Sequence, residues 1–574
     1  MNNLHRRKRP LAALVGAGLL ASGLAGVTAL NQAAVSAAPA APAGECPVAF
    51  PAAALASGDS VTGLTVARGT TPASFTGEVL GVVKDGIAAG VDMIIADLSS
   101  PDIDAAGGIW AGMSGSPVHA ADGRLIGAVS YGLSWGPSKV AGITPYEHMD
   151  DLHRGQSARS NVSLRGSLAG TVAGAAGVSK DQAARGMTRL QVPMSATGID
   201  PARIAKVADR PWIRSPRSAG AAVGSVGREA IVAGGNLGAS VSSGTVTYSG
   251  VGTVTSVCQG SVVGFGHPLA YMGQTSAALH PAEAVYVQED SANTPFKVAN
   301  LGAPVGVIDN DRLAGISGVL GPVPDGTTIS STSRYGNRSF SGTSTVTVPL
   351  YAPEVVWMHN ATTNDRAVDG WAKGNGLVSW TITGTDEKGA PFTLERTDRH
   401  PAGWDLASEA VGEAPDLLWQ LQRLSGVEVD SVESDITLSQ STARLRVAGV
   451  EQRAKGKWVK VRGPVVAKAG KKMVLRVVLK NAKQTVRRKV SLVVPRRFKG
   501  TSTPAWVRGG RRHYGDWSND SVAALKEYVA KSARNDQAVL VLGRGDDDRA
   551  VPEAVTPAAP SIVVGQQRIR VVIR

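Results

Sequence analysis

Short runs of β-branched residues separated by glycine constrain this chain more than any other feature of its sequence. Glycine accounts for 68 of the 574 residues and aromatic residues for only 5%, while valine, threonine and serine are frequent between the glycines. β-Branched residues favour strands, and glycine supplies the backbone freedom that tight turns need. The sequence therefore predicts a mainly β protein, and its length predicts three or four domains.

The N-terminus has the pattern of an export signal. A basic stretch at residues 5–9 precedes an apolar run at residues 11–30, and small residues at 35–37 offer a cleavage site. This pattern predicts a signal peptide over residues 1–37 and a secreted or cell-envelope location. The alternative is an uncleaved membrane anchor, because the run is close to the ~20 residues that a span needs.

The two cysteines of the chain, Cys46 and Cys258, are far apart in the sequence. An exported protein meets oxidising conditions, so a disulfide between them is chemically feasible. Two free thiols are the alternative, because sequence alone does not bring the two residues together.

Composition divides the rest of the chain into units. Residues 38–57 are rich in alanine and proline and are expected to be a linker, and residues 58–154 form a β unit with a hairpin signal at Asp122–Gly123. Four further units follow: a connector at 155–215 with a short helix near 180–185, a second β unit at 216–345, a β-sandwich with a helix near 415–424 at 346–450, and a basic β module with a C-terminal α/β segment at 451–574.

Positive charge is concentrated near the C-terminus. Residues 451–500 hold 17 lysines and arginines and a single acid, Glu451, so this block alone exceeds the net charge of +14 of the whole chain. The charges alternate with strand-like runs, which predicts a sheet with one cationic face. We expect an anionic cell-wall polymer or membrane surface as its partner rather than nucleic acid, and the alternative is a solvated face without a partner.

The turn at residues 112–117, Gly-Met-Ser-Gly-Ser-Pro, is the strongest candidate for chemistry. A serine hydroxyl becomes a nucleophile when a base lies within hydrogen-bonding reach and donors point at the oxyanion. Gly112 and Gly115 permit a sharp turn around Ser114, in which the N–H groups of Gly112 and Ser114 face one pocket. Ser116 is the competing hydroxyl, and an ordinary glycine-rich turn is the alternative explanation.

A base for this serine must lie downstream in the chain. The only upstream histidine is His5, inside the predicted signal. His267 ends an apolar strand between Gly266 and Pro268, an ordered position that is open on one side, as a general base requires. The remaining downstream candidates near the turn are His119, His148 and His153.

Several stretches resemble the SpoIVB peptidase family, which is named after stage IV sporulation protein B. The first block comprises residues 63–69, 75–81, 107–118, 123–129 and 141–145, and the second comprises residues 264–268 and 310–318. The resemblance covers residues 58–150 and about 230–325, and its first block is the more specific.

The resemblance implies a serine peptidase with a trypsin-like double β-barrel that hydrolyses a protein or peptide substrate, or itself. Carried over, Ser114 is the nucleophile, His267 the general base, and Gly112 and Ser114 the oxyanion hole. Asp97 is the best match to the acidic residue of the family. Three other aspartates remain alternatives, namely Asp102, Asp104 and Asp311.

Chain order departs from the family. In the sporulation peptidase the histidine block comes first, whereas here the serine block does, so we expect a circular permutation of the two barrels, followed by Ig-like β-sandwich modules. No metal or other cofactor is implied, because the sequence has no cluster with ligand spacing. The competing hypothesis is a non-catalytic cell-envelope-binding protein with a degenerate peptidase fold.

Overall fold

The computed structural model describes residues 46–574 except for 135, 150–160, 191, 193, 212, 214–217, 220–224, 291–293, 511–519 and 544–551. The predicted signal peptide and residues 38–45 of the predicted linker lie outside the described residues. The described chain is mainly β, as the sequence predicted, and it contains two six-stranded antiparallel barrels.

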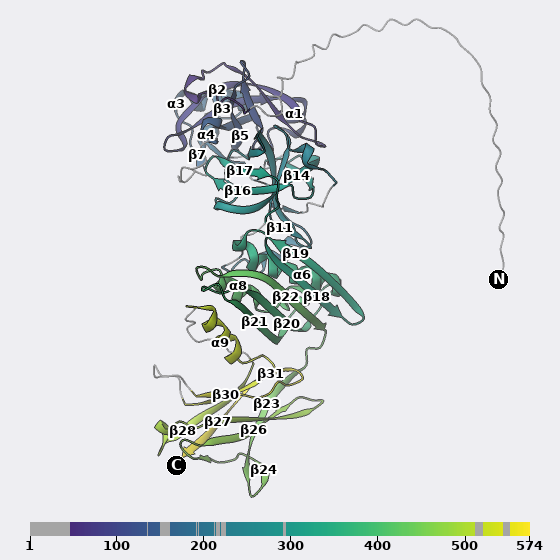
Figure 1. Cartoon of the computed structure of the whole chain (residues 1–574), viewed down its shortest axis with the longest axis vertical. Coiled ribbons are helices and arrows are strands. Elements are labelled where there is room, and N and C mark those ends of the chain that lie inside the picture. Colours follow the sequence, from purple (N-terminus) through teal and green to yellow (C-terminus); the bar gives the residue numbers. More distant parts are fainter. Residues whose placement is uncertain are drawn as a thin grey trace, which may run out of the picture. The chain divides into compact units, whose positions relative to one another are not determined.

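The first barrel carries the Ser114 turn and closes through six strands. Its strands β2, β3 and β5 are labelled in Figure 1. Its ring runs β4-β1-β2-β3-β6-β5, and β5 pairs back onto β4. Alternate residues of β1 are buried, so the valines and isoleucines of the strands fill the interior. The strands are β1 (Ser60–Thr65), β2 (Ala73–Ala88), β3 (Val91–Ser99), β4 (Pro117–Ala120), β5 (Leu125–Leu133) and β6 (Val140–Pro145).

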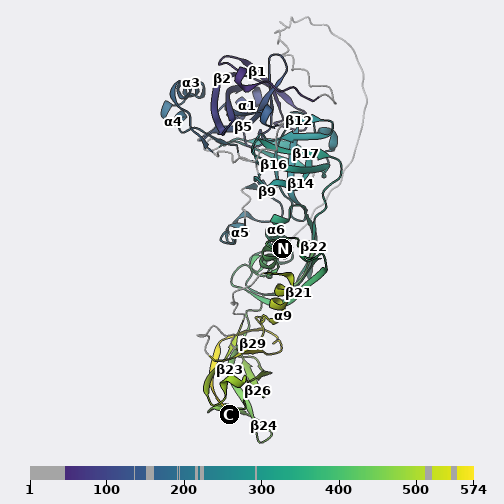
Figure 2. The same ribbon diagram turned by 60° about the vertical axis from the view of Figure 1, so that its left-hand side comes forward.

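The second barrel has the same connectivity as the first. Its strands β12, β14, β16 and β17 are labelled in Figure 2. Its ring runs β12-β13-β17-β16-β14-β11, so in both barrels the order around the ring is first, second, third, sixth, fifth and fourth. Strand β15 (Phe296–Leu301) extends β14 as a hairpin outside the ring. The ring strands are β11 (Asn236–Gly244), β12 (Tyr248–Cys258), β13 (Ser261–Gly264), β14 (Gly273–Gln288), β16 (Gly306–Arg312) and β17 (Gly315–Leu320).

The predicted connector contributes a strand to the first barrel. Strand β8 (Met187–Arg189) pairs antiparallel with β5, and β7 (Asn161–Val162) pairs with β8. The predicted helix near residue 180 is confirmed as α4 (Lys180–Ala184), which begins with a capping box at Ser179. The other connector elements are α3 (Gly166–Ala176), β9 (Met194–Ala196) and α5 (Pro201–Ala205), and β10 (Ser218–Ala219) follows the predicted connector.

Residues 327–439, the middle module, form one sheet with helices packed on it. The structure has this arrangement in place of the expected β-sandwich at 346–450, and the sheet also takes in residues 327–346 of the second predicted β unit. The predicted helix near 415 is confirmed as α8 (Ala414–Leu421). The other elements are β18 (Thr327–Tyr335), β19 (Arg338–Val346), α6 (Ala352–Val368), β20 (Gly374–Thr385), β21 (Pro391–Ala402), α7 (Leu406–Glu409) and β22 (Glu428–Ser439).

Residues 444–574, the C-terminal module, form two five-stranded sheets around one apolar core. Helix α9 (Val522–Lys531) belongs to this part of the chain but packs against β21 of the middle module. One sheet contains β23 (Arg444–Ala454), β24 (Lys457–Lys460), β26 (Lys472–Lys480), β27 (Thr485–Val493) and β31 (Ile562–Val564). The other contains β25 (Val465–Ala467), β28 (Ser502–Gly509), β29 (Ala538–Leu542), β30 (Glu553–Val555) and β32 (Gln566–Ile573).

Short helices complete the described chain. They are α1 (Pro101–Ala106), α2 (Tyr146–Met149) and the 3-10 turns η1 (Ala52–Ala54), η2 (Arg228–Ala230), η3 (Pro349–Tyr351) and η4 (Arg496–Phe498).

Candidate active site

Ser114 lies in a tight turn just before β4, with glycine on both sides of it. Gly112 and Gly115 have φ angles of 96° and 98°, in the left-handed region that disfavours any residue with a Cβ. A Cβ on Gly115 would also lie 2.0 Å from the carbonyl oxygen of Thr253 and 2.5 Å from the amide nitrogen of Phe265. The turn therefore packs directly against the backbone of the second barrel, and only glycine fits at position 115.

His267 follows β13 and is directed toward Ser114 by the two residues before it. Phe265 and Gly266 have φ angles of 67° and 66°, which reverse the chain at the end of the strand. The Nε2 atom of His267 lies 3.0 Å from the Oγ atom of Ser114. The structure thus brings together a hydroxyl from the first barrel and an imidazole from the second, 153 positions apart in the chain.

Three threonine hydroxyls hold the two turns in place by hydrogen bonds that cross between the barrels. Each donates to a backbone carbonyl beside Ser114 or His267, and all three are buried. The sequence alone does not single out these threonines, although threonine alternates along β12 at residues 253 and 255. The pairs are Thr144 to Gly266 at 2.6 Å, Thr253 to Gly112 at 3.1 Å and Thr255 to Gly115 at 2.7 Å.

Both ring nitrogens of His267 are engaged. Nδ1 lies 2.8 Å from the carbonyl oxygen of Pro268, and a carbonyl only accepts, so Nδ1 carries the proton. The lone pair of Nε2 then faces the hydroxyl of Ser114. Burial lowers the pKa of His267 to about 4, against an opposing hydrogen bond to Pro268. The imidazole is therefore neutral at neutral pH, as a general base must be.

The structure does not bring Asp97 into contact with His267. Asp97 lies on β3 opposite Glu78 and Val140, and burial raises the pKa of its carboxyl while the charge of Lys139 opposes that rise. Within the described part of the chain, no hydrogen bond joins its carboxylate to the imidazole of His267.

Neither of the aspartates on α1 contacts His267 among the described residues. Asp102 and Asp104 lie in the first turn of that helix, and Asp104 forms an ion pair with Lys139. The hydrogen-bond partner of the imidazole Nδ1 is a backbone carbonyl instead.

Asp311, the fourth candidate, acts on the loop that follows His267. Its fully buried carboxylate accepts hydrogen bonds from the amides of Leu269 at 2.7 Å, Ala270 at 2.8 Å and Met272 at 3.0 Å. Burial raises the pKa of this carboxyl, and the amide hydrogen bonds oppose that rise. Asp311 therefore fixes the loop whose first carbonyl, that of Pro268, orients the imidazole.

Two amide groups beside the serine hydroxyl are unused. Met113 N–H donates to Trp110 and Gly115 N–H donates to Val129. Among the described residues, no hydrogen-bond partner is found for the N–H groups of Gly112, which precedes Met113, and of Ser114, which precedes Gly115. Unpaired amides in a buried turn are costly unless a ligand uses them, so these two N–H groups are available to an acceptor beside the hydroxyl of Ser114.

A buried lysine that the sequence analysis missed lies against the same turn. Lys297 is 2% exposed, and its Cβ is 2.9 Å from where a Cβ on Gly112 would be. Its Nζ donates to Asn236 Oδ1 at 2.7 Å, and burial lowers its pKa to about 7. Lys297 packs the turn from the side of the β14–β15 hairpin.

Two other buried serine–histidine pairs lack the surroundings of Ser114. Ser240 lies 2.8 Å from His280 Nε2, and Ser344 lies 2.9 Å from His359 Nδ1. Both serines are in the interior of strands, β11 and β19, where the ladder engages the backbone. The combination of a base, a glycine turn and two unused amides distinguishes the site of Ser114.

The remaining candidates are not at this site. Ser116 Oγ donates to Thr65 Oγ1 at 2.9 Å, and His119 lies on β4, where burial lowers its pKa. His148 lies in α2, and His153 lies outside the described residues. Ser114 and His267 are therefore the predicted pair that the structure brings together.

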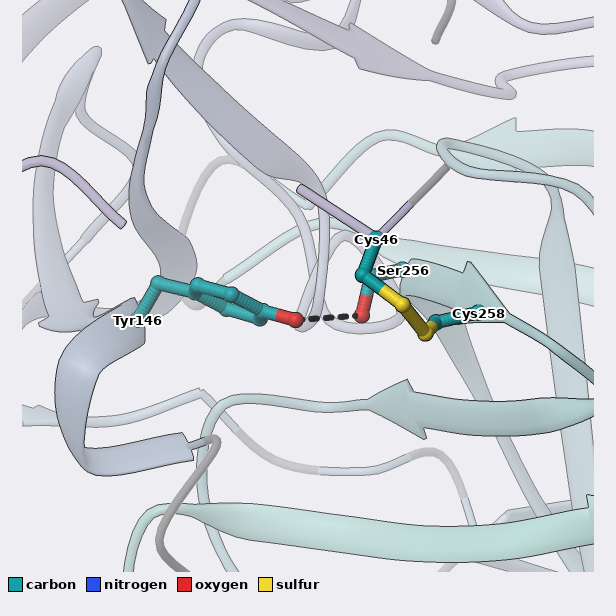
Figure 3. Close-up of a disulfide and its surroundings, with 4 residues drawn as sticks. All are labelled: Cys46, Tyr146, Ser256 and Cys258. Carbon is teal, nitrogen blue, oxygen red and sulfur yellow. Dashed lines mark hydrogen bonds between the residues drawn. A yellow bond between two sulfur atoms is a disulfide. The ribbon is translucent and has the colours of Figure 1, made fainter. Parts of the chain in front are cut away.

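A disulfide joins Cys46 to Cys258 at the end of β12, close to the hydrogen bond between Tyr146 and Ser256 (Figure 3). From Cys46 the chain continues along the first barrel, where Leu125 exchanges backbone hydrogen bonds of 2.9 Å with Val48 and Phe50. Residues 46–50 therefore form a strap that ties the first barrel covalently to the second.

No family model matches this chain, and no curated protein or solved structure is significantly similar to it. Within the described residues there is no group of three or more His, Cys, Asp or Glu side chains that would hold a metal ion. None of the described helices has the length and hydropathy of a membrane span.

Proposed function

We propose that this chain is a serine peptidase in which Ser114 is the nucleophile and His267 the general base. The observation that carries the proposal is the 3.0 Å contact between Ser114 Oγ and the unprotonated Nε2 of His267, beside two unused amides. The proposal includes membership of the SpoIVB family and a trypsin-like arrangement with permuted barrels. Two barrels of identical connectivity, with the serine-bearing one first, support this part.

The chemistry follows from the positions of the groups. Ser114 Oγ attacks the carbonyl carbon of the substrate while its proton passes to Nε2, and the N–H groups of Gly112 and Ser114 stabilise the oxyanion. When the C–N bond breaks, His267 returns the proton to the leaving amine, and water then hydrolyses the acyl-enzyme. The Pro268 carbonyl holds Nδ1–H throughout, which is the role that the family resemblance implies for Asp97.

Proteolysis of an unfolded protein substrate tests this function. We expect Ser114→Ala and His267→Ala to lower kcat/KM by about 10³-fold or more, because the hydroxyl and the base act as one unit. Ser116→Ala is the matched control and is expected to retain the parent activity, because its hydroxyl bonds to Thr65. Undiminished proteolysis by Ser114→Ala would reject the proposed nucleophile.

The proposal also includes export and attachment to the cell envelope. A disulfide between Cys46 and Cys258 is compatible with an oxidising compartment. In the C-terminal module, which we propose to be an Ig-like sandwich, residues alternate between buried and exposed along β26, and Arg487 and Lys489 are exposed on β27. This cationic face supports binding to an anionic polymer or membrane surface.

A further inference from the structure

The proposed site is closed in this structure. Ser114 is 0% exposed and His267 is 2% exposed, so a substrate reaches them only if a covering segment leaves. A segment beside the site is β8, which lies antiparallel next to β5 with Arg189 opposite Tyr131 and Thr188 opposite Gly132. Because peptides commonly bind by adding a strand to a sheet, a strand beside the site is in the position of a ligand.

The ladder of β8 continues one residue further, toward the site. The amide of Leu190 donates to the carbonyl of Ser130 at 2.9 Å. Val129, the residue before Ser130, exchanges backbone hydrogen bonds with the nucleophile turn, accepting from Gly115 at 2.8 Å and donating to Ser116 at 3.0 Å. Leu190 thus pairs with Ser130, and the next residue of the chain, Val129, pairs with the turn that holds Ser114.

The turn that holds His267 also packs against Ser130. The hydroxyl of Ser130 lies 2.1 Å from where a Cβ on Gly266 would be, so the residue before His267 packs directly on Ser130. The charge of Arg189 is close enough to His267 to contribute, after burial, to lowering its pKa. Arg189 and Leu190 are therefore positioned beside the base and the nucleophile turn.

The side chain of Leu190 fills an apolar pocket of the first barrel. Leu190 is 4% exposed and belongs to the core cluster that includes Ile109, Trp110 and Met113. A Cβ on Gly132 would lie 3.0 Å from Leu190 Cδ2, so the lack of a side chain at residue 132 leaves room for Leu190 beside β5. An apolar pocket of this kind accepts a medium-sized aliphatic group and rejects a carboxylate.

We propose that residues 187–190 occupy the place of the acyl half of a bound peptide, and that the site takes an extended peptide with a leucine-sized aliphatic residue immediately before the cleaved bond. This inference rests on the proposed peptidase function. In this arrangement Ser114 attacks the carbonyl of the residue before the cleaved bond. Leu190 occupies the pocket that selects the side chain of that residue. The tethered strand competes with free substrates, which enter when β8 leaves β5.

Peptide p-nitroanilides test the specificity on the unmodified full-length protein. The series is acetyl-Met-Thr-Arg-Xaa-p-nitroanilide, in which Xaa is leucine, alanine or aspartate. We expect kcat/KM for the leucine peptide to exceed that for the alanine peptide by about 10-fold or more, and hydrolysis of the aspartate peptide to be lower still. Equal rates for the three peptides would overturn the inference.

A variant of the tethered strand tests the competition. Leu190→Asp is expected to weaken docking of β8 and to raise kcat/KM for the leucine peptide several-fold, whereas the volume-conserving control Leu190→Met is expected to stay close to the parent. A soluble, folded Leu190→Asp protein with unchanged or lower activity would contradict the competition. If that variant does not fold, the peptide series on the parent still decides the specificity.

Labelling with a fluorophosphonate separates this inference from the function on which it rests. One outcome would reject the inference but not the peptidase function. In it, Ser114 is labelled, yet hydrolysis rates change neither with substitution of residue 190 nor with the last residue of the peptide. No labelling of either the parent or Leu190→Asp, and no hydrolysis of any peptide, would reject the peptidase function itself.

Discussion

The imidazole of His267 is held at both of its nitrogens. Its Nδ1–H is held by the Pro268 carbonyl at 2.8 Å, and its Nε2 faces Ser114 at 3.0 Å. A carboxylate at Nδ1 would favour the protonated ring, whereas a neutral carbonyl orients the ring without adding charge. Burial, with no carboxylate at Nδ1 among the described residues, keeps the imidazole of His267 unprotonated at neutral pH.

This setting predicts an unusual pH profile. Protonated His267 cannot accept the serine proton, and burial lowers the pKa of His267 to about 4. As the pH is lowered, kcat/KM is therefore expected to stay constant through pH 6.5 and to fall only as the pH approaches 4. An unperturbed histidine would lose half of its activity near pH 6.5. Initial rates on the leucine peptide between pH 4 and pH 8 measure the profile, and a midpoint near 6.5 would contradict it.

For single residues, the sequence predicted the conformation of the turn at Ser114, because glycine and proline restrict or permit particular backbone angles. Gly112 and Gly115 lie on either side of Ser114 and have left-handed backbone angles. Because glycine adopts these angles most readily, the sequence indicates a tight turn there. The partner of Nδ1 was not predictable, because a backbone carbonyl is present at every residue. Asp97 was therefore chosen on resemblance, although its strand directs it toward Glu78 and Lys139.

Among the structural elements, the loop after β13 determines where the base lies. Asp311 on β16 holds this loop through three amide hydrogen bonds, and Phe265 and Gly266 reverse the chain ahead of it. A side chain that acts on the loop rather than on the imidazole is a positioning residue. Its loss is expected to change the orientation and burial of His267.

Asp311→Asn tests this positioning role. The amide replaces one acceptor oxygen by a donor, which leaves buried amides unpaired and is expected to cost about 1–3 kcal/mol of unfolding free energy. Loosening the loop is also expected to move the midpoint of the pH profile upward from 4. Asp309→Asn on the same strand is the matched control, and equal pH profiles for all three proteins would reject the role of Asp311.

Periodicity predicted the elements that follow simple patterns. The hairpin at Asp122–Gly123 joins β4 to β5, and α8 lies where helical spacing indicated it. Helix α6 was missed because its buried faces carry polar residues such as His359, Asn360 and Asn364, which do not form an apolar stripe. Some strand content was expected in the connector, but the three residues of β8 carry no periodicity, so this strand is located by its pairing with β5 rather than by its sequence.

At the scale of the whole molecule, each barrel supplies half of the site. Ser114 comes from the first barrel and His267 from the second, and the hydroxyls of Thr144 and Thr255 bond across the boundary between the barrels. The Cys46–Cys258 strap adds a covalent link between the barrels. The geometry of the site therefore depends on how the barrels dock as well as on each barrel alone.

Breaking the disulfide is expected to destabilise the protein. It closes a loop of 212 residues, for which the chain-entropy model gives about 5 kcal/mol. Urea unfolding of the parent and of the Cys46→Ser/Cys258→Ser variant measures the difference, and a reductant should lower the stability of the parent only. Equal free energies of unfolding would show that the strap contributes nothing.

The cationic face of the C-terminal module is expected to bind anionic surfaces. Cosedimentation with vesicles that contain an anionic lipid should fall as salt rises, and Arg487→Glu/Lys489→Glu should weaken it by about 10-fold or more, at roughly 1 kcal/mol per charge. The control, Lys180→Glu/Arg185→Glu, makes the same charge change in the connector. Equal losses in the two variants would indicate nonspecific attraction and count against a dedicated face.

The most direct test of the proposed site is the location of a covalent adduct. A fluorophosphonate should form one adduct per chain, and peptide mass spectrometry should locate it at Ser114, with labelling slowed by at least about 10³-fold in His267→Ala. An adduct at any other residue, or labelling that persists in Ser114→Ala, would contradict the account.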